Sequence, residues 1–150
     1  MYKILFVCHG NICRSPMAEF VMKDLVEKSG LEDRFYVESA ATSAEEIGND
    51  MYPEARLKLA DEGIDAPCRG ARQIRPEDYG AFDFIIGMDE ENRYNLKRYF
   101  SPDLDNKVSL LLDFTDEPHA IADPWYTNEF DTTYKEIVAG CQGLLAHLIS

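Results

Sequence analysis

A continuous apolar run from Ile4 to Val7 leads directly into the segment Cys8–Ser15 (CHGNICRS), and a helical pattern opens at Pro16. Such a run, followed at once by turn residues, is typical of a strand buried on both faces. The sequence therefore predicts a strand, a loop and a helix in immediate succession. A thiol, five intervening residues and an arginine in that loop indicate a binding site for a phosphate dianion, with a nucleophile directed at it.

Strand and helix patterns alternate along the rest of the chain, with no internal repeat or linker between them. Alternation of this kind favours parallel crossovers and a three-layer α/β sandwich, here a single catalytic domain over residues 1–150. Ligands of such sheets bind beyond the carboxyl ends of the strands, which is where the first strand delivers Cys8. The expected strands cover residues 4–7, 35–41, 82–88 and 107–112, and the expected helices cover 16–30, 53–62, 89–100 and 132–149.

The chain is strongly acidic, with 15 basic and 28 acidic residues and a formal net charge of −13. This balance argues against nucleic acid or an anionic membrane as partner, since both attract a basic face. An anionic substrate is repelled at long range, so the loop must create its own local positive potential. Because no apolar stretch approaches the ~20 residues of a membrane span and the N-terminus lacks a signal-peptide layout, we expect a cytoplasmic protein without membrane insertion.

Four cysteines, at positions 8, 13, 68 and 141, are expected to be reduced thiols. A chain of this length buries enough surface to fold without disulfides. Cys8 and Cys13 form the only close pair, and no second pair of ligand residues follows it. We therefore predict neither a metal site nor another cofactor.

The residue types of the loop suit an anion cradle. Gly10 and Asn11 tolerate left-handed backbone angles, which turn successive N–H groups inward. Arg14 can hold two phosphate oxygens, and Pro16 suits the first turn of the following helix. The positive helix end and the arginine favour a thiolate at Cys8, to which Ser15 can donate a hydrogen bond. The alternative is a buried core thiol at a strand end beside a surface arginine.

The motif VCHGNICRSPMAE (residues 7–19) resembles the signature of the low-molecular-weight protein tyrosine phosphatases. The similarity continues through Ser39, DFIIGMDEEN (83–92) and DPWY (123–126), and so covers nearly the whole chain. It implies a phosphatase I-like fold with a four-stranded parallel sheet of order 2-1-3-4. It also implies hydrolysis of phosphotyrosine, in a protein or a small aryl phosphate, through a cysteinyl-phosphate. Inhibition by phosphate-like oxyanions is expected, and the oligomeric state stays open.

The resemblance implies the roles of individual residues. A carboxylic acid suits protonation of the leaving phenolate, and Pro124 would stiffen the backbone beside Asp123, although Asp-Pro also makes ordinary turns. The family carries its proton donor in such a pair, which favours Asp123 as general acid and then base. The aromatic residues after it line the mouth in the family, although both also suit a core. The expected site thus comprises Cys8 as nucleophile, Arg14 as phosphate clamp and Asp123 as acid, with His9, Gly10, Asn11, Ile12, Cys13, Ser15 and Ser39 binding phosphate or supporting the loop, and Trp125, Tyr126 and Glu45 as the substrate wall.

The chain departs from the family pattern at two places. Glu45, followed by Glu46, stands where many relatives have an aromatic residue, and two carboxylates at the mouth would disfavour acidic phosphopeptides and favour basic ones, unless the loop is merely solvated. Arg69 stands where many relatives have a histidine that supports the loop asparagine. It either takes over that support, or joins Arg72 and Arg75 in a basic patch, or faces solvent.

Two loop positions bear on substrate and redox chemistry. Ile12 matches the tyrosine phosphatases, whereas some bacterial relatives that act on phosphoarginine have threonine there. Cys13 is a candidate resolving thiol that would trap oxidised Cys8 as a disulfide, the alternative being plain loop packing. An arsenate reductase of the same fold would need a late cysteine pair, and Cys68 and Cys141 stand alone. A phosphoprotein-binding module without turnover is the remaining alternative, against which the joint presence of nucleophile, clamp and acid argues.

Overall fold

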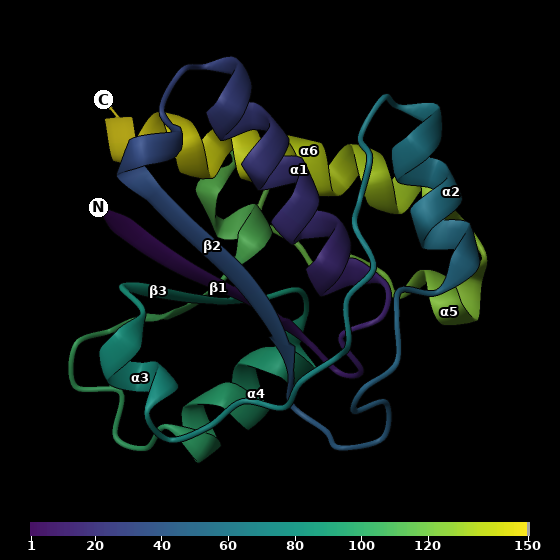
Figure 1. The fold of residues 1–150 in the computed structure, drawn as a ribbon. Coiled ribbons are helices and arrows are strands. Elements are labelled where there is room, and N and C mark those ends of the chain that lie inside the picture. The colour runs from purple at the N-terminus through teal and green to yellow at the C-terminus, as the bar shows by residue number, and fades with distance from the viewer. Residues whose placement is uncertain (150) are drawn as a thin grey trace.

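The computed structural model describes residues 1–149 and contains a four-stranded parallel sheet in the order β2-β1-β3-β4. Helices cover both faces of this sheet (Figure 1), so the predicted three-layer α/β sandwich of order 2-1-3-4 is confirmed. The strands are β1 (Tyr2–Cys8), β2 (Phe35–Ala41), β3 (Phe84–Gly87) and β4 (Val108–Leu110). The α-helices are α1 (Arg14–Lys28), α2 (Pro53–Asp61), α3 (Asp78–Ala81), α4 (Glu90–Tyr99), α5 (Pro124–Thr127) and α6 (Phe130–Ile149), and the 3₁₀ turns are η1 (Glu32–Arg34) and η2 (Leu111–Phe114).

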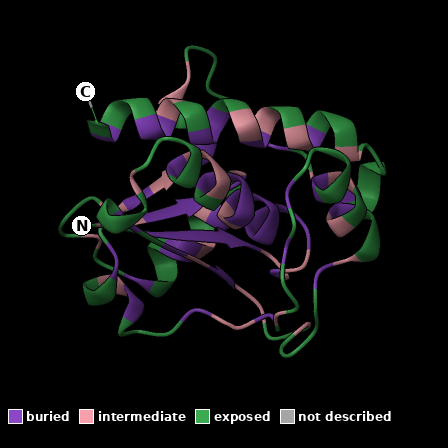
Figure 2. Cartoon of the chain, turned by 45° about the horizontal axis from the view of Figure 1, so that its top comes forward, coloured by how far each residue is buried: buried purple, intermediate pink, exposed green. Residues whose placement is uncertain are grey.

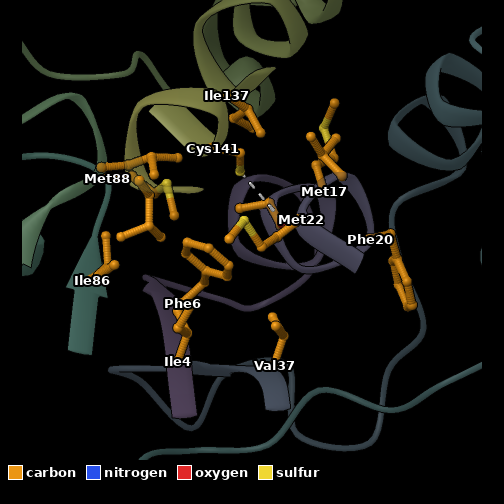
Figure 3. Packing of buried hydrophobic residues seen from close by; sticks show 14 of the residues in the cluster. Ile4, Phe6, Met17, Phe20, Met22, Val37, Ile86, Met88, Ile137 and Cys141 are labelled. Atoms are coloured by element: carbon orange, nitrogen blue, oxygen red, sulfur yellow. Dashed lines mark hydrogen bonds between the residues drawn. The ribbon is translucent and has the colours of Figure 1, made fainter. Parts of the chain in front are cut away.

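The central strand β1 is buried on both faces, as its apolar run predicts. Ile4 and Phe6 point to the side covered by α1 and α6, where they pack among Met17, Met22 and Cys141 (Figure 3). Its alternate residues, Leu5 and Val7, belong to the second core cluster, on the α4 side. Figure 2 shows the same contrast between buried strands and helices exposed along their outer faces. The sheet thus holds the carboxyl end of β1, and the loop that leaves it, between two packed layers.

The last expected strand is shorter in the structure than the sequence pattern suggests. It ends at Leu110, because the Asp113 carboxylate accepts a hydrogen bond of 3.0 Å from the Leu110 N–H and turns the chain into η2. Helix α6 then packs directly on this turn. A Cβ atom built at Gly143 would lie 2.1 Å from the Phe114 carbonyl oxygen, so glycine allows the close approach of helix and turn.

The described part of the chain has neither a helix long and apolar enough to span a membrane nor a group of three or more His, Cys, Asp or Glu side chains arranged to hold a metal ion.

Candidate active site

The segment from residue 8 to residue 15 runs from the last residue of β1 into the first turn of α1 and wraps around the Cys8 sulfur. Asn11 adopts a left-handed backbone angle, φ 61°, and is completely buried. Its backbone N–H donates to Cys8 Sγ over 3.3 Å, and the Ser15 hydroxyl oxygen lies 3.1 Å from the same sulfur. The sulfur therefore sits among hydrogen-bonding groups suited to stabilise a negative charge.

The side chain of Asn11 holds the loop in this shape. Its amide nitrogen donates to Ser15 Oγ over 2.7 Å and to Ser39 Oγ, at the end of β2, over 2.9 Å. Ser39 in turn donates to the Glu19 carboxylate of α1 over 2.6 Å. A buried polar network in which each member finds partners fixes one geometry, so the Cys8 sulfur is positioned before any ligand arrives.

Arg69 completes the network from the other side. Its guanidinium donates to the side-chain oxygen of Asn11, which also accepts from the Arg72 backbone N–H over 3.3 Å. Burial lowers the pKa of Arg69 below its ordinary value. The three arginines do not form a basic patch, because the Arg72 guanidinium pairs with Asp78 at 3.0 Å and the exposed Arg75 pairs with Glu77 at 3.6 Å. Arg69 thus contacts the loop asparagine, where many relatives are expected to use histidine.

Arg14, at the start of α1, is 98% buried, since only 2% of its surface is exposed. One terminal nitrogen donates to Asp89 Oδ2 over 2.7 Å and to the Ile121 carbonyl over 2.8 Å, and the other lies 3.6 Å from Asp123 Oδ2. Burial opposes its charge, but the attraction of Cys8 and of these carboxylates outweighs that effect and raises the pKa of Arg14. Its Nε atom has no hydrogen-bond partner, so one donor of the fork is open to a ligand.

Asp123 precedes the short helix α5 and caps it. Its Oδ1 accepts from the Trp125 backbone N–H over 3.0 Å, and Pro124 occupies the first helical position. Its second oxygen remains directed at Arg14. The cap fixes the carboxyl group beside the cradle, with one oxygen available for proton transfer.

A cavity of about 120 Å³ opens over the loop. Two aromatic side chains, Trp125 and Tyr126, line it and are 52% and 82% exposed. Tyr52 packs edge-on against Trp125, with 4.9 Å between the ring centroids. Both aromatic residues after Pro124 therefore lie at the mouth rather than in the core. The lining residues are Cys8, His9, Gly10, Ile12, Cys13, Arg14, Glu45, Glu46, Asp123, Trp125 and Tyr126.

The four cysteines are all free thiols. Cys13 lines the cavity but is almost fully buried, and its burial, with the nearby Cys8, raises the pKa of its thiol. Cys68 is exposed, and Cys141 is buried in the core, where burial likewise raises the pKa.

Two supporting residues were not assigned from the sequence. Asp89, which holds Arg14, follows β3 and caps α4 by accepting from the Asn92 N–H over 2.8 Å. Neighbouring parallel strands end at one edge of the sheet, so the position of Asp89 beside the Cys8 loop was a usable signal. Glu19, which accepts from Ser39, looks in the sequence like any other acidic residue of a helix, so no such signal existed for it.

Comparison with known proteins agrees with this geometry. The family model described as low molecular weight phosphotyrosine protein phosphatase matches residues 3–150. The low molecular weight protein-tyrosine-phosphatase YfkJ of Bacillus subtilis is 38% identical over 150 residues, covering 99% of this chain and 96% of that protein. The human low molecular weight phosphotyrosine protein phosphatase is 39% identical over 147 residues, covering 95% of this chain and 92% of that protein.

Solved structures give the same result. The crystal structure of YfkJ superposes with a TM-score of 0.95 and covers 99% of this chain and 94% of its own. A Drosophila arginine phosphatase, 33% identical, superposes with a TM-score of 0.89 and covers 99% of this chain and 98% of its own. The fold, the loop and the matched length together show that the chain belongs to the low molecular weight phosphotyrosine protein phosphatase family.

Proposed function

We propose that this protein is a protein-tyrosine phosphatase that hydrolyses phosphotyrosine in proteins, or small aryl phosphates, through a cysteinyl-phosphate intermediate. The observation that carries the proposal is the arrangement around one cavity of the Cys8 sulfur, the open Nε of buried Arg14, and the carboxyl group of Asp123. The names of the relatives, which are tyrosine phosphatases, support the same activity.

In the first step the Cys8 thiolate attacks phosphorus while Arg14 and the loop N–H groups hold the non-bridging oxygens. The bond from phosphorus to the aryl oxygen breaks, and Asp123 gives its proton to that oxygen, so that a neutral phenol leaves. In the second step Asp123 takes a proton from water, the water oxygen attacks phosphorus, and the sulfur leaves as thiolate. Inorganic phosphate is the second product.

Within this proposal Asn11, Ser15 and Ser39 support the loop, and His9, Gly10 and Ile12 border the bound phosphate. Trp125 and Tyr126 are expected to flank the phenyl ring, whose phosphate would reach the depth of Cys8. Phosphate-like oxyanions such as vanadate are expected to compete for the same cradle.

The test is release of phosphate from para-nitrophenyl phosphate and from a phosphotyrosine peptide, with EDTA present. We expect turnover by the wild type, none by Cys8→Ser, and no loss on chelation. Loss of activity on chelation would contradict the proposal. A phosphoarginine peptide and arsenate serve as competing substrates, because one structural neighbour is named an arginine phosphatase. Faster turnover of either would replace the proposed activity, and stable phosphopeptide binding without turnover would indicate a binding module.

We further propose that Cys13 protects the nucleophile from irreversible oxidation. A peroxide oxidises the Cys8 thiolate to a sulfenic acid and is itself reduced to water; Cys13 then attacks the oxidised sulfur, a disulfide forms and water is released. Cys8 and Cys13 line the same cavity, which supports the proposal. Four free thiols also suit a reducing compartment, and we propose a cytoplasmic location on that ground.

A further inference from the structure

The cavity is also lined by two carboxylates, Glu45 and Glu46, which form its acidic rim. Neither is left to move freely. Glu45 Oε2 lies 3.0 Å from His9 Nε2, and Glu46 Oε2 accepts from the Asn49 side-chain amide over 2.6 Å. Both side chains are therefore held at the mouth by partners from neighbouring loop positions.

Glu46 lies directly over the phosphate loop. A Cβ atom built at Gly10 would be 3.4 Å from Glu46 Cγ, which places the glutamate stem in contact range of the loop backbone. A carboxylate this near the cradle interacts with whatever is attached to the bound phosphoryl group, and not only with bulk solvent.

In the part of the chain that the structure describes, no lysine or arginine pairs with these two carboxylates. Among the described residues that line the cavity, Arg14 is the one guanidinium or ammonium group. One of its terminal nitrogens donates to Asp89 and Ile121, and the other lies 3.6 Å from Asp123 Oδ2. Asn49 is neutral, and His9 is a titratable group 43% exposed to solvent. The buried Nε of Arg14 has no hydrogen-bond partner among the described residues, which suits an anion in the cavity, while the rim carries the carboxylates of Glu45 and Glu46.

We propose that Glu45 and Glu46 select phosphotyrosine substrates that carry lysine or arginine next to the phosphotyrosine, an inference that rests on the proposed phosphatase activity. A flanking cation would pair with the rim carboxylates while the phosphate enters the cradle, which offsets the repulsion that a bare anion meets. In the free enzyme the His9 ring contacts the Glu45 carboxylate. In the complex the lysine or arginine of the substrate replaces His9 as the partner of that carboxylate. An acidic flank would instead add like charges at the rim.

The experiment compares kcat/KM for two phosphotyrosine peptides that differ only in their flanking residues, lysine and arginine in one, glutamate in the other. Exposed ion pairs contribute little each and are screened by salt, so we expect the basic peptide to be preferred by roughly five- to tenfold at about 0.01 M ionic strength. The preference should shrink at about 0.15 M, where screening is stronger. In the double variant Glu45→Gln, Glu46→Gln the ratio of the two kcat/KM values should fall to within about twofold of one.

The matched control removes two acidic charges elsewhere. Glu32 and Asp33 are exposed in η1, at the opposite end of β2 from the mouth, and the variant Glu32→Gln, Asp33→Asn should keep the wild-type ratio. If this control lowers the ratio as much as the rim variant does, the preference comes from overall charge and the proposal is wrong. A wild-type ratio near one also overturns it.

The variant His9→Ala is an independent test, because it removes the partner of Glu45. We expect its ratio of kcat/KM for the basic peptide to that for the acidic peptide to rise above the wild-type value. A fall would contradict the proposal that His9 pairs with Glu45 where the substrate cation binds. The ratio is taken within each enzyme preparation, so a change in overall rate cancels. If no peptide and no para-nitrophenyl phosphate is hydrolysed, the proposed function itself fails; equal hydrolysis of both peptides defeats only the selectivity.

Discussion

The guanidinium of Arg69 donates a hydrogen bond to the side-chain oxygen of Asn11, a residue 58 positions earlier in the chain. The amide nitrogen of Asn11 meanwhile donates to Ser15 and Ser39, so the asparagine is held at both ends. This pair of residues keeps a left-handed loop position in place directly beneath the nucleophile.

Replacing Arg69 should therefore weaken catalysis without removing any group that touches the phosphate. A hydrogen bond with a charged donor contributes about 1.5–3 kcal/mol, so we expect Arg69→Ala to lower kcat/KM for para-nitrophenyl phosphate by about tenfold or more. Arg75→Ala is the control, since the exposed Arg75 side chain pairs with Glu77, away from the loop, and the variant should behave as wild type. Equal activity of both variants would show that Asn11 keeps its geometry unaided.

Asp123→Asn separates proton donation from helix capping. The asparagine keeps an oxygen that can accept from the Trp125 N–H, so α5 should stay capped. We expect kcat/KM on phenyl phosphate, a poor leaving group, to fall by roughly 10²–10⁴. The loss on para-nitrophenyl phosphate should be smaller, because its phenolate needs less protonation. A loss that does not depend on the leaving group would remove Asp123 from the acid role.

The cysteines should differ in their reaction with iodoacetamide at neutral pH. Burial raises the pKa of Cys13 and of Cys141, so both stay as thiols, and the thiolate that reacts forms only as the pH rises far above neutral. Cys8, the proposed nucleophile, and the exposed Cys68 should be alkylated first. Peptide mass spectrometry measures this order, and vanadate should protect Cys8 alone. Rapid alkylation of Cys13 would contradict it.

Oxidation with hydrogen peroxide tests the proposed partnership of Cys8 and Cys13. In the wild type we expect inactivation that dithiothreitol reverses, together with a disulfide-linked peptide containing both cysteines. Cys13→Ser should lose most of the recoverable activity after the same treatment, since the sulfenic acid then proceeds to irreversible forms. Cys68→Ser is the control and should recover like the wild type. Full recovery of Cys13→Ser would exclude Cys13 as the resolving thiol.

Gly143→Ala should destabilise the fold although alanine favours helices. Its Cβ would meet the Phe114 carbonyl at 2.1 Å, a backbone atom that cannot move aside like a side chain. Overpacking of this kind costs about 2 kcal/mol, or about 4–8 °C in Tm for a chain of this size. Gly80→Ala, with nothing within 4 Å of its Cβ, should be neutral or slightly stabilising. Calorimetry measures the Tm of both variants, and an unchanged Tm of Gly143→Ala would contradict the prediction.

The parts of the site that are local in sequence were predictable. The apolar run before Cys8 and the proline after Ser15 indicated the strand, the loop and the helix, and the structure places them as expected. Helix α5 was not predicted, although Asp123 and Pro124 carry its start signal, because four residues are too few to show a helical period.

Contacts between distant segments could not be predicted in the same way. Arg14 and Asp89 lie 75 positions apart, and their pairing depends on β1 and β3 ending side by side. Arg69 reaches Asn11 because the chain around Gln73 bridges to Ala41 at the end of β2. The periodicity of the sequence does not indicate such contacts, since they depend on how the complete sheet packs.

The position of Arg14 between two carboxylates has a consequence for ligand thermodynamics. A dianion that enters the cavity joins Asp89, Asp123 and the Cys8 sulfur around a single guanidinium. Negative charges so crowded in a buried space favour uptake of a hydrogen ion from solvent when the dianion is captured. Sulfate, whose own charge is constant across the working range, should thus be held more tightly as acidity increases, and the heat of its capture should vary with the ionisation enthalpy of the buffer.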